Sequence, residues 1–228
     1  MSICYIVGAG EFYGKIEPKS SDLVIAADGG ADTLKRLGVR CDLLLGDMDS
    51  LREKANEKSF PTGCNTPSSK MDDATEVQSE ERAPEAIVYP VEKDETDTHL
   101  AYLEGERRGY TDFRIYGGVG GREDHTFANY SLLLYAKNRG HRMILVGDGY
   151  EYFVIKNESV TLSGRTGSTL SVFAFGGAAL GVDILGAKYE AKGATLSPEF
   201  PLGVSNSFVG KDITVSVKDG ALLVMKAI

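Results

Sequence analysis

The sequence contains few cysteines, no excess of basic residues and no long hydrophobic run. Cys4, Cys41 and Cys64 are far apart and have no C-x-x-C spacing, which argues against a disulfide framework or a zinc knuckle and is typical of a reducing compartment. No run of about 18 apolar residues occurs, and no basic segment precedes the first apolar run. We therefore expect a cytoplasmic protein that is neither secreted nor inserted in a membrane.

The shortage of basic residues also limits the possible partners. The chain has 33 acidic and 25 basic residues, giving a formal charge of -8. Because phosphate backbones are held by basic stripes, we expect no nucleic-acid partner. The P-loop motif G-x-x-x-x-G-K-[ST] is absent as well. A nucleotide site in this chain would therefore need another way of holding phosphate, with Mg²⁺ and a few placed basic residues.

The first two thirds of the chain alternate short apolar runs with segments of helical period. The expected strands are 3–8, 23–27, 43–45, 86–89, 113–116 and 143–146, and the expected helices are 31–37, 98–108 and 126–137. Gly38, Gly109 and Gly140 stand where C′ glycines end helices. This order predicts a parallel sheet covered by helices.

After Asp148 the helical period disappears. The expected strands are then 150–155, 159–162, 168–175, 187–190, 213–217 and 221–226, separated by glycines and turn pairs. The sequence therefore predicts an α/β fold with an N-terminal parallel-sheet, Rossmann-like domain over 1–148, followed by a C-terminal antiparallel β-sandwich domain over 149–228. The polar segment 52–85 is assigned to no element: an irregular excursion and a charged helix both fit, and a lid function stays open.

Acidic loops follow three consecutive strands of the predicted parallel sheet. They contain Asp28, the pair Asp47 and Asp49, and the run Glu92-Lys93-Asp94-Glu95-Thr96-Asp97. Ligands bind at the carboxyl ends of such strands, and converging carboxylates need a cation to offset their repulsion. A single loop could equally be a solvated turn or a helix cap. Three on one edge favour Mg²⁺, which takes oxygen ligands.

A glycine-rich loop follows the fifth strand, with the sequence GGVGGREDH over 117–125. Backbone without Cβ atoms can wrap a phosphate, the following helix N-terminus offers free N–H groups, and Arg122 adds a planar fork. We therefore predict anion binding here. His125 could contact phosphate or orient a carboxylate, and it could also be a structural cap. Near the N-terminus, 8–10 form a Gly-Ala-Gly turn that lacks the third glycine of a dinucleotide fingerprint, and we interpret it as a strand-end turn.

Together these segments resemble the thiamine pyrophosphokinase family in its bacterial form. The resemblance rests on ADGGAD at 27–32, GDMDS at 46–50, EKDETDT at 92–98, GGVGGREDHTFAN at 117–129 and GVSN at 203–206. It implies Mg²⁺-dependent transfer of a diphosphate group from ATP to the hydroxyl of thiamine, giving thiamine diphosphate and AMP. It also implies a homodimer, with active sites between the acidic loops of one chain and the β domain of the other.

The resemblance also implies residue roles. Asp47, Asp49, Asp94 and Asp97 would hold Mg²⁺, Thr96 and Arg122 would hold phosphate oxygens, and Asp124 would lie near the transferred group as a candidate base. ATP and thiamine would be bound by Asp28, Gly29, Gly30, Lys93, Gly120, Gly121, His125, Ser205 and Asn206. We expect Ser205 and Asn206 in a turn between strands, with Phe208 as an aromatic neighbour of thiamine.

Two alternatives remain open at this stage. Another diphosphotransferase, for example of the pterin type, would keep the acidic loops and change the acceptor pocket, and the Ser205-Asn206 pair speaks against it. A non-catalytic thiamine- or nucleotide-binding protein would have lost a carboxylate, whereas the sequence keeps every carboxylate that the resemblance calls for.

Overall fold

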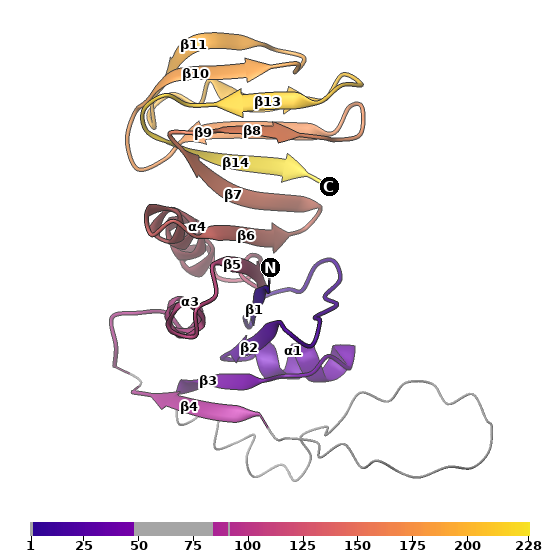
Figure 1. Ribbon diagram of the computed structural model, residues 1–228, viewed down its shortest axis with the longest axis vertical. Helices are drawn as coiled ribbons and strands as arrows, with labels where there is room; N and C mark the ends of the chain where they lie inside the picture. The colour runs from indigo at the N-terminus through magenta and orange to yellow at the C-terminus, as the bar shows by residue number, and fades with distance from the viewer. Residues whose placement is uncertain (1, 48–83, 91) are drawn as a thin grey trace, which may run out of the picture.

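The computed structural model describes residues 2–47, 84–90 and 92–228, and of Asp47 only its place in a strand. The molecule is elongated, with the α/β part at one end and the β-rich part at the other (Figure 1). The helices are α1 (Gly30–Leu37), α3 (Asp97–Arg107) and α4 (Glu123–Asn138). The strands are β1 (Cys4–Val7), β2 (Leu23–Ala27), β3 (Leu43–Asp47), β4 (Glu85–Tyr89), β5 (Asp112–Tyr116), β6 (Arg142–Gly147), β7 (Tyr150–Lys156), β8 (Ser159–Leu162), β9 (Thr169–Ala174), β10 (Ala179–Leu185), β11 (Ala191–Leu196), β12 (Gly203–Ser207), β13 (Ile213–Ser216) and β14 (Ala221–Ala227).

One sheet runs through both parts of the molecule. Its order is β12-β9-β14-β7-β6-β5-β1-β2-β3-β4. The six strands from β6 to β4 are parallel, and those from β7 to β12 are antiparallel. The two halves join at the hairpin between β6 and β7, where Asp148 and Gly149 form the turn. The division predicted between 148 and 149 falls in this hairpin, and as a domain boundary it stays a prediction.

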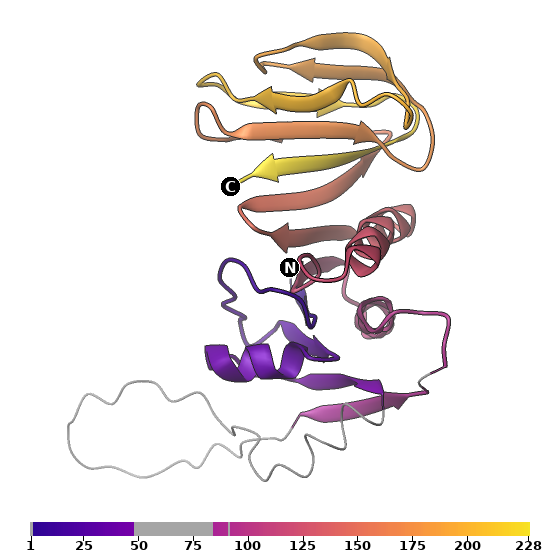
Figure 2. The same ribbon diagram turned by 180° about the vertical axis from the view of Figure 1, so that it is seen from behind.

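Helices cover both faces of the parallel half. Alternate residues of β1 point to opposite faces: Ile6 belongs to the core that includes α3 and α4, and Val7 belongs to the core that includes Leu34 of α1. Figures 1 and 2 show α1 on the opposite side of the sheet from α3 and α4. The parallel sheet with helices around it, predicted from the alternation of strand and helix patterns, is confirmed.

The antiparallel half is covered by a second sheet of order β11-β10-β13-β8. Leu170, Val172 and Leu222 of the long sheet share a core with Val182 and Val215 of the short one. This is the predicted sandwich. Among the described residues both sheets are open at their ends, and β12 and β4 are the two edge strands of the long sheet.

Part of the C-terminal strand prediction is wrong. The segment 187–190 connects β10 to β11 and is not a strand, and β10, β11 and β12 were not predicted as such. Ala187 forms only an isolated bridge with Phe208. The backbone N–H and C=O of Tyr189 both form hydrogen bonds with the side chain of Asn206, so they do not pair with a neighbouring strand. Of the unassigned segment, residues 52–83 lie outside the described residues, and Glu85 already begins β4. No helix in the described ranges is both long and apolar enough to cross a membrane.

Candidate active site

A crevice of about 250 Å³ lies at the carboxyl ends of β1 and β5. The chain proceeds from β1 to β2 on one side and from β5 to β6 on the other. These two strands therefore form the switch point at which open α/β sheets bind ligands. We call this space the glycine crevice, and it is lined by Gly8, Ala9, Gly10, Ala27, Asp28, Asp97, Thr98, Gly117, Gly118, Gly120, Gly121, Arg122, His125, Thr126 and Asn129.

The turns after β1 and β5 are in backbone contact at the floor of the crevice. Gly8 N donates to Tyr116 O at 2.8 Å, and Gly10 N donates to Gly117 O at 2.9 Å. Gly117 has a φ of 64°, and a Cβ there would lie 2.5 Å from Gly8 O. Only glycine therefore fits at this approach.

The rest of the glycine loop is held from below by α4. Asn129, which is buried, donates from Nδ2 to Gly118 O at 2.8 Å. Among the residues that the structure describes, no hydrogen bond is donated by the amides of Gly118, Gly120 and Gly121. These N–H groups are free for an anion, as predicted anion binding at this loop requires.

Asp28 lies at the end of β2 with a φ of 52°, in the left-handed region. Its amide donates to Leu45 O at 2.9 Å, which ties it to the neighbouring strand β3. Of the predicted binding residues Asp28, Gly29 and Gly30, only Asp28 lines the glycine crevice. A Cβ on Gly30 would lie 1.8 Å from Val7 O, so this glycine allows α1 to pack against β1.

The N-terminus of α3 brings a second carboxylate to the crevice. Thr96 is the N-cap, and its hydroxyl accepts from His99 N at 3.2 Å. Asp97 follows, lines the crevice, and accepts from Lys93 Nζ at 2.6 Å. Thr96 and Lys93 do not line the crevice. Their observed contacts position Asp97.

Arg122 and Asp124 form a fork-shaped ion pair at the start of α4. Arg122 donates from Nε at 3.1 Å and from Nη2 at 2.5 Å to the two carboxylate oxygens. These hydrogen bonds lower the pKa of Asp124 below its ordinary value, so the group is a carboxylate at neutral pH. Both side chains are largely exposed, and Arg122 and His125 line the crevice whereas Asp124 does not.

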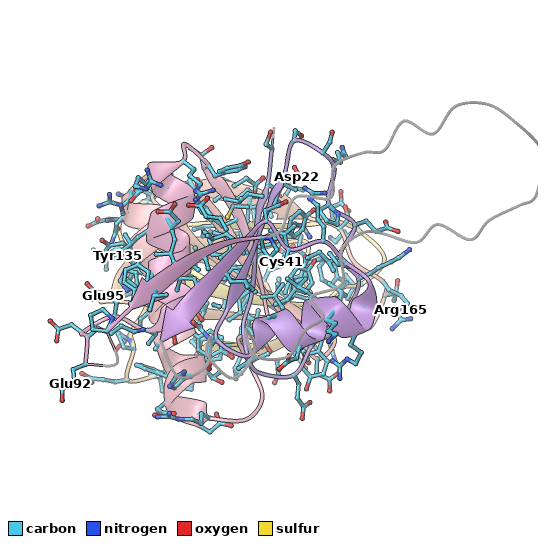
Figure 3. All side chains as sticks on the ribbon, turned by 90° about the horizontal axis from the view of Figure 1, so that it is seen from below. Asp22, Cys41, Glu92, Glu95, Tyr135 and Arg165 are labelled. Atoms are coloured by element: carbon cyan, nitrogen blue, oxygen red, sulfur yellow. The ribbon has the colours of Figure 1, made fainter. Side chains whose placement is uncertain are left out.

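The predicted group of four metal-binding carboxylates is only partly described. Asp97 lines the crevice, Asp94 is exposed outside it, and Asp47 ends β3, the strand next to β2. Asp49 lies outside the described residues. Within residues 2–47, 84–90 and 92–228, no three His, Cys, Asp or Glu side chains come together as a metal site. Glu92 and Glu95 of the same acidic loop are exposed at the margin of the molecule (Figure 3).

A second cavity, of about 200 Å³, lies against the edge strand β12. We call it the β12 cavity, and it is lined by Ile184, Tyr189, Glu190, Ala191, Leu196, Leu202, Gly203, Val204 and Asn206. The prediction that Ser205 and Asn206 lie in a turn is wrong, because both belong to β12. A register shift between Gly203 and Asn206 and a φ of 58° at Ser205 form a bulge, which exposes Ser205 and buries Asn206.

The predicted aromatic neighbour of the acceptor is wrong as well. Phe208 is 1% exposed and packs where Gly164 leaves room, so its ring cannot face a ligand. Tyr189, at 61% exposed, is the aromatic residue that lines the β12 cavity.

Several residues that line the two cavities were missed. Gly8 and Gly10 were set aside because the third glycine of the fingerprint stood out of place, although two glycines after a first strand were signal enough. Asn129 belongs to the segment 117–129 that carries the family resemblance, but no role was predicted for it. Tyr189 carried no local signal, since only tertiary contacts bring it to β12.

The fold and the glycine crevice define an α/β protein with a glycine-rich crevice at the switch point of a parallel sheet, the place where open sheets of this kind bind ligands. The comparisons with known proteins give the particular family. The family model "Thiamin pyrophosphokinase, catalytic domain" matches residues 16–145, more than half of the chain, and "Thiamin pyrophosphokinase, vitamin B1 binding domain" matches residues 155–222. The chain therefore belongs to the thiamin pyrophosphokinase family, and its activity is that of a thiamine diphosphokinase, a transferase.

Solved structures share the fold over their whole length. A thiamin pyrophosphokinase from Geobacillus thermodenitrificans has 23% identity and a TM-score of 0.77, with 99% of this chain and 97% of that chain covered. A thiamin pyrophosphokinase family protein from Enterococcus faecalis has 23% identity and a TM-score of 0.77, with 99% and 98% covered. A thiamine pyrophosphokinase from Bacillus subtilis has 20% identity and a TM-score of 0.75, with 99% and 98% covered. No curated protein was found to match the sequence.

Proposed function

We propose that the chain transfers the terminal diphosphate of ATP to the hydroxyl of thiamine with the help of Mg²⁺, and releases AMP. The observation that carries this proposal is the glycine crevice, which combines free loop amides, an arginine and two carboxylates. Transfer of this kind depends mainly on alignment and charge neutralisation, so no nucleophilic side chain is required.

The triphosphate of ATP would lie along the glycine loop. The amides of Gly118, Gly120 and Gly121 would donate to phosphate oxygens, and the fork of Arg122 would turn from Asp124 to the same oxygens. Because Arg122 is largely exposed, this exchange needs no repacking.

The donors of the crevice fit Mg²⁺, since Asp28 and Asp97 offer carboxylate oxygens at adjacent strand and helix ends. Asp47, Asp49 and Asp94 would complete the set. When bound, the cation would neutralise phosphate charge and polarise the transferred group. Lys93 holds Asp97 in place through its ion pair.

In the reaction, the thiamine oxygen would attack the β-phosphorus, and the bond from this phosphorus to the oxygen that bridges to the α-phosphate would break. That oxygen leaves with AMP. We assign the hydroxyl proton to Asp124, whose carboxylate is released once Arg122 turns to the phosphates.

We further propose that thiamine binds in the β12 cavity of a second copy of the chain. Within one chain, five strand-to-strand steps separate β5 from β12, which is roughly 24 Å at the usual strand spacing. One thiamine molecule cannot span that distance. The exposed side chains of Phe200, Leu202 and Val204 on the edge strand and its approach also favour a homodimer there.

Incubation with thiamine, ATP and Mg²⁺ tests the reaction. Equal amounts of thiamine diphosphate and AMP are expected. Binding of thiamine without product would favour the non-catalytic alternative, and diphosphate transfer to a pterin alcohol but not to thiamine would favour the pterin type.

The reducing environment suited to free Cys4 and Cys41 leads us to place the reaction in the cytoplasm.

Mixed dimers test the shared site. An Asp97→Asn chain lacks a crevice carboxylate, and an Asn206→Ala chain is altered at the β12 cavity. The assay is run at a thiamine concentration well below the KM of the Asn206→Ala chain, where both variants are impaired. If each site uses both chains, a mixture of the two variants regains activity at one site of each mixed dimer. Mixed dimers that form and stay as impaired as the parent variants would contradict the shared site.

A further inference from the structure

The side chain of Asn206 is almost fully engaged within the protein. Its Oδ1 accepts from Tyr189 N at 3.0 Å and from Ser207 N at 2.9 Å, which occupies both lone pairs. Its Nδ2 donates to Tyr189 O at 2.7 Å. The residue is 4% exposed. Asn206 therefore has no acceptor left for a ligand, although it lines the β12 cavity.

These hydrogen bonds fix a neighbouring loop. Asn206 holds both backbone groups of Tyr189, and Lys188 N donates to Ser207 O at 3.0 Å in the same connection between β10 and β11. The Tyr189 ring, in contrast, is 61% exposed and lines the cavity. A rigid backbone thus presents a largely solvent-accessible ring.

The bulge of β12 explains how a residue of an edge strand can turn inward and hold the backbone of a neighbouring loop. The left-handed conformation at Ser205, whose amide donates to Ser171 Oγ at 3.1 Å, interrupts the alternation of the strand. Val204 and Ser205 are consequently both exposed, and Asn206 is turned inward toward the loop.

We propose that Asn206 is a positioning residue, which fixes the Tyr189 backbone so that the Tyr189 ring contacts the aromatic rings of thiamine in the β12 cavity. The proposal rests on the proposed function for the identity of the acceptor. Tyrosine suits this role because its ring offers a flat apolar face with little conformational freedom to lose on binding.

A double-mutant cycle tests the proposal, with thiamine affinity measured by calorimetry on the full chain. Tyr189→Ala and Asn206→Ala should each weaken binding about tenfold or more, the scale of a lost aromatic contact. In the Tyr189→Ala background, Asn206→Ala should change the affinity by less than about twofold, because the group through which it acts is gone. Steady-state kinetics should show a raised KM for thiamine with kcat and the KM for ATP unchanged.

Two further variants control the cycle. Asp183→Ala removes a 2.7 Å bond to Gly193 N in the same β10–β11 hairpin, away from Tyr189, and should leave thiamine affinity unchanged. Asn206→Asp keeps the two accepted bonds but sets a carboxylate oxygen, in place of the amide donor, against Tyr189 O, so that this carbonyl loses its partner. It provides a second variant if Asn206→Ala does not fold, and its loss of affinity should also vanish in the Tyr189→Ala background.

The outcomes separate the proposal from the function on which it rests. If the two substitutions weaken binding by factors that multiply, Asn206 contacts thiamine directly and the positioning role is wrong. Full affinity in Tyr189→Ala would overturn the proposal as well. An unaltered chain that neither binds nor converts thiamine would instead overturn the proposed function. In Asn206→Ala without ligand, the amide proton of Tyr189 should exchange faster with solvent, because the hydrogen bond from Tyr189 N to Asn206 Oδ1 is lost.

Discussion

The glycine crevice and the β12 cavity are built from different parts of the chain. The crevice is formed largely by backbone, with Gly8, Gly10 and Gly117 so close that a Cβ would collide with a carbonyl oxygen. The β12 cavity is formed mainly by apolar side chains, which come from the edge strand and its approach, from the loop beside it and from the two strands that this loop joins. A site made of backbone restricts its residues to glycine, whereas a site made of side chains accepts many sequences. The first is therefore visible in a sequence and the second is not.

The two regions also share one device. In each, a buried asparagine ties a loop to a regular element: Asn129 of α4 holds Gly118 O, and Asn206 of β12 holds the backbone of Tyr189. An amide is suited to this task, because it donates and accepts without bringing a charge into the interior.

The largest expected effect is on the crevice side of the comparison. Asp97→Asn removes a negative charge from the proposed cation site and should reduce kcat by more than the roughly 10- to 100-fold typical of residues that support a metal site indirectly. Chelation should abolish the activity, and added Mg²⁺ should restore it.

The matched control is Glu95→Gln in the same acidic loop, since Glu95 is exposed and does not line the crevice (Figure 3). Its kcat should stay within about twofold of the unaltered chain, the scale of a surface change. Equal losses in both variants would mean that the loop acts only through its net charge.

Gly117→Ala tests whether the crevice depends on backbone contact. Gly117 and Gly38 have nearly the same φ, 64° and 63°, but a Cβ at 117 lies 2.5 Å from Gly8 O and one at 38 meets nothing within 4 Å. Gly38→Ala should cost about 1–2 kcal/mol for the left-handed conformation alone. Gly117→Ala should cost about 1–3 kcal/mol more, measured by urea unfolding. Equal losses of unfolding free energy in the two variants would show that the backbone at the floor of the crevice shifts to accommodate a Cβ at position 117.

The same contrast explains how far the sequence predicted the fold. The parallel half was predicted because buried strands such as 23–27 are continuous apolar runs and the helices end at Gly38, Gly109 and Gly140, all with positive φ. The edge strand β12 was not predicted, because its sequence GVSNS resembles a turn and only pairing with β9 makes it a strand. The pair Asp148-Gly149 was interpreted as a boundary, although it is also a hairpin that continues the sheet.

For the site, the sequence predicted those residues whose position follows from a strand end. Asp28, Asp97, Gly120, Gly121, Arg122 and His125 all line the glycine crevice. Lys93, Asp94, Thr96 and Asp124 belong to the same loops without lining it, because local spacing does not determine which side chains of a loop point inward. Tyr189 depends on contacts with residues that are distant in sequence, and such contacts leave no local pattern.

Asn129→Ala should have a smaller effect than the loss of a glycine in the floor. It leaves the carbonyl of Gly118 without its buried donor, which should cost about 1–3 kcal/mol of stability. The KM for ATP should rise while the KM for thiamine stays unchanged, the reverse of the expectation for Asn206. Asn138→Ala, at the exposed end of the same helix, should change neither KM. An Asn129 variant with unaltered KM for ATP would show that the glycine loop holds its shape unaided.

The smallest expected structural effect concerns Arg122 and Asp124. Arg122→Lys keeps the positive charge and loses the planar fork that now donates two hydrogen bonds to Asp124. Since these bonds are the main cause of the lowered pKa of Asp124, the pKa should rise toward its ordinary value, as measured by NMR titration of the carboxyl group. A carboxyl group whose pKa is lower in the folded than in the unfolded protein stabilises the fold at pH values above its unfolded pKa. This stabilisation is lost as the pH falls through its folded pKa.

Both side chains are largely exposed, so the stability of Arg122→Lys at neutral pH should not change measurably. Its kcat should nevertheless fall, because a point charge cannot replace a fork on two phosphate oxygens. The control is Arg165→Lys, on the β-rich part of the molecule and outside both cavities, which should keep full activity. If Arg122→Lys retains kcat within about twofold, Arg122 contributes charge alone, and the phosphate geometry of the crevice is set by the glycine backbone.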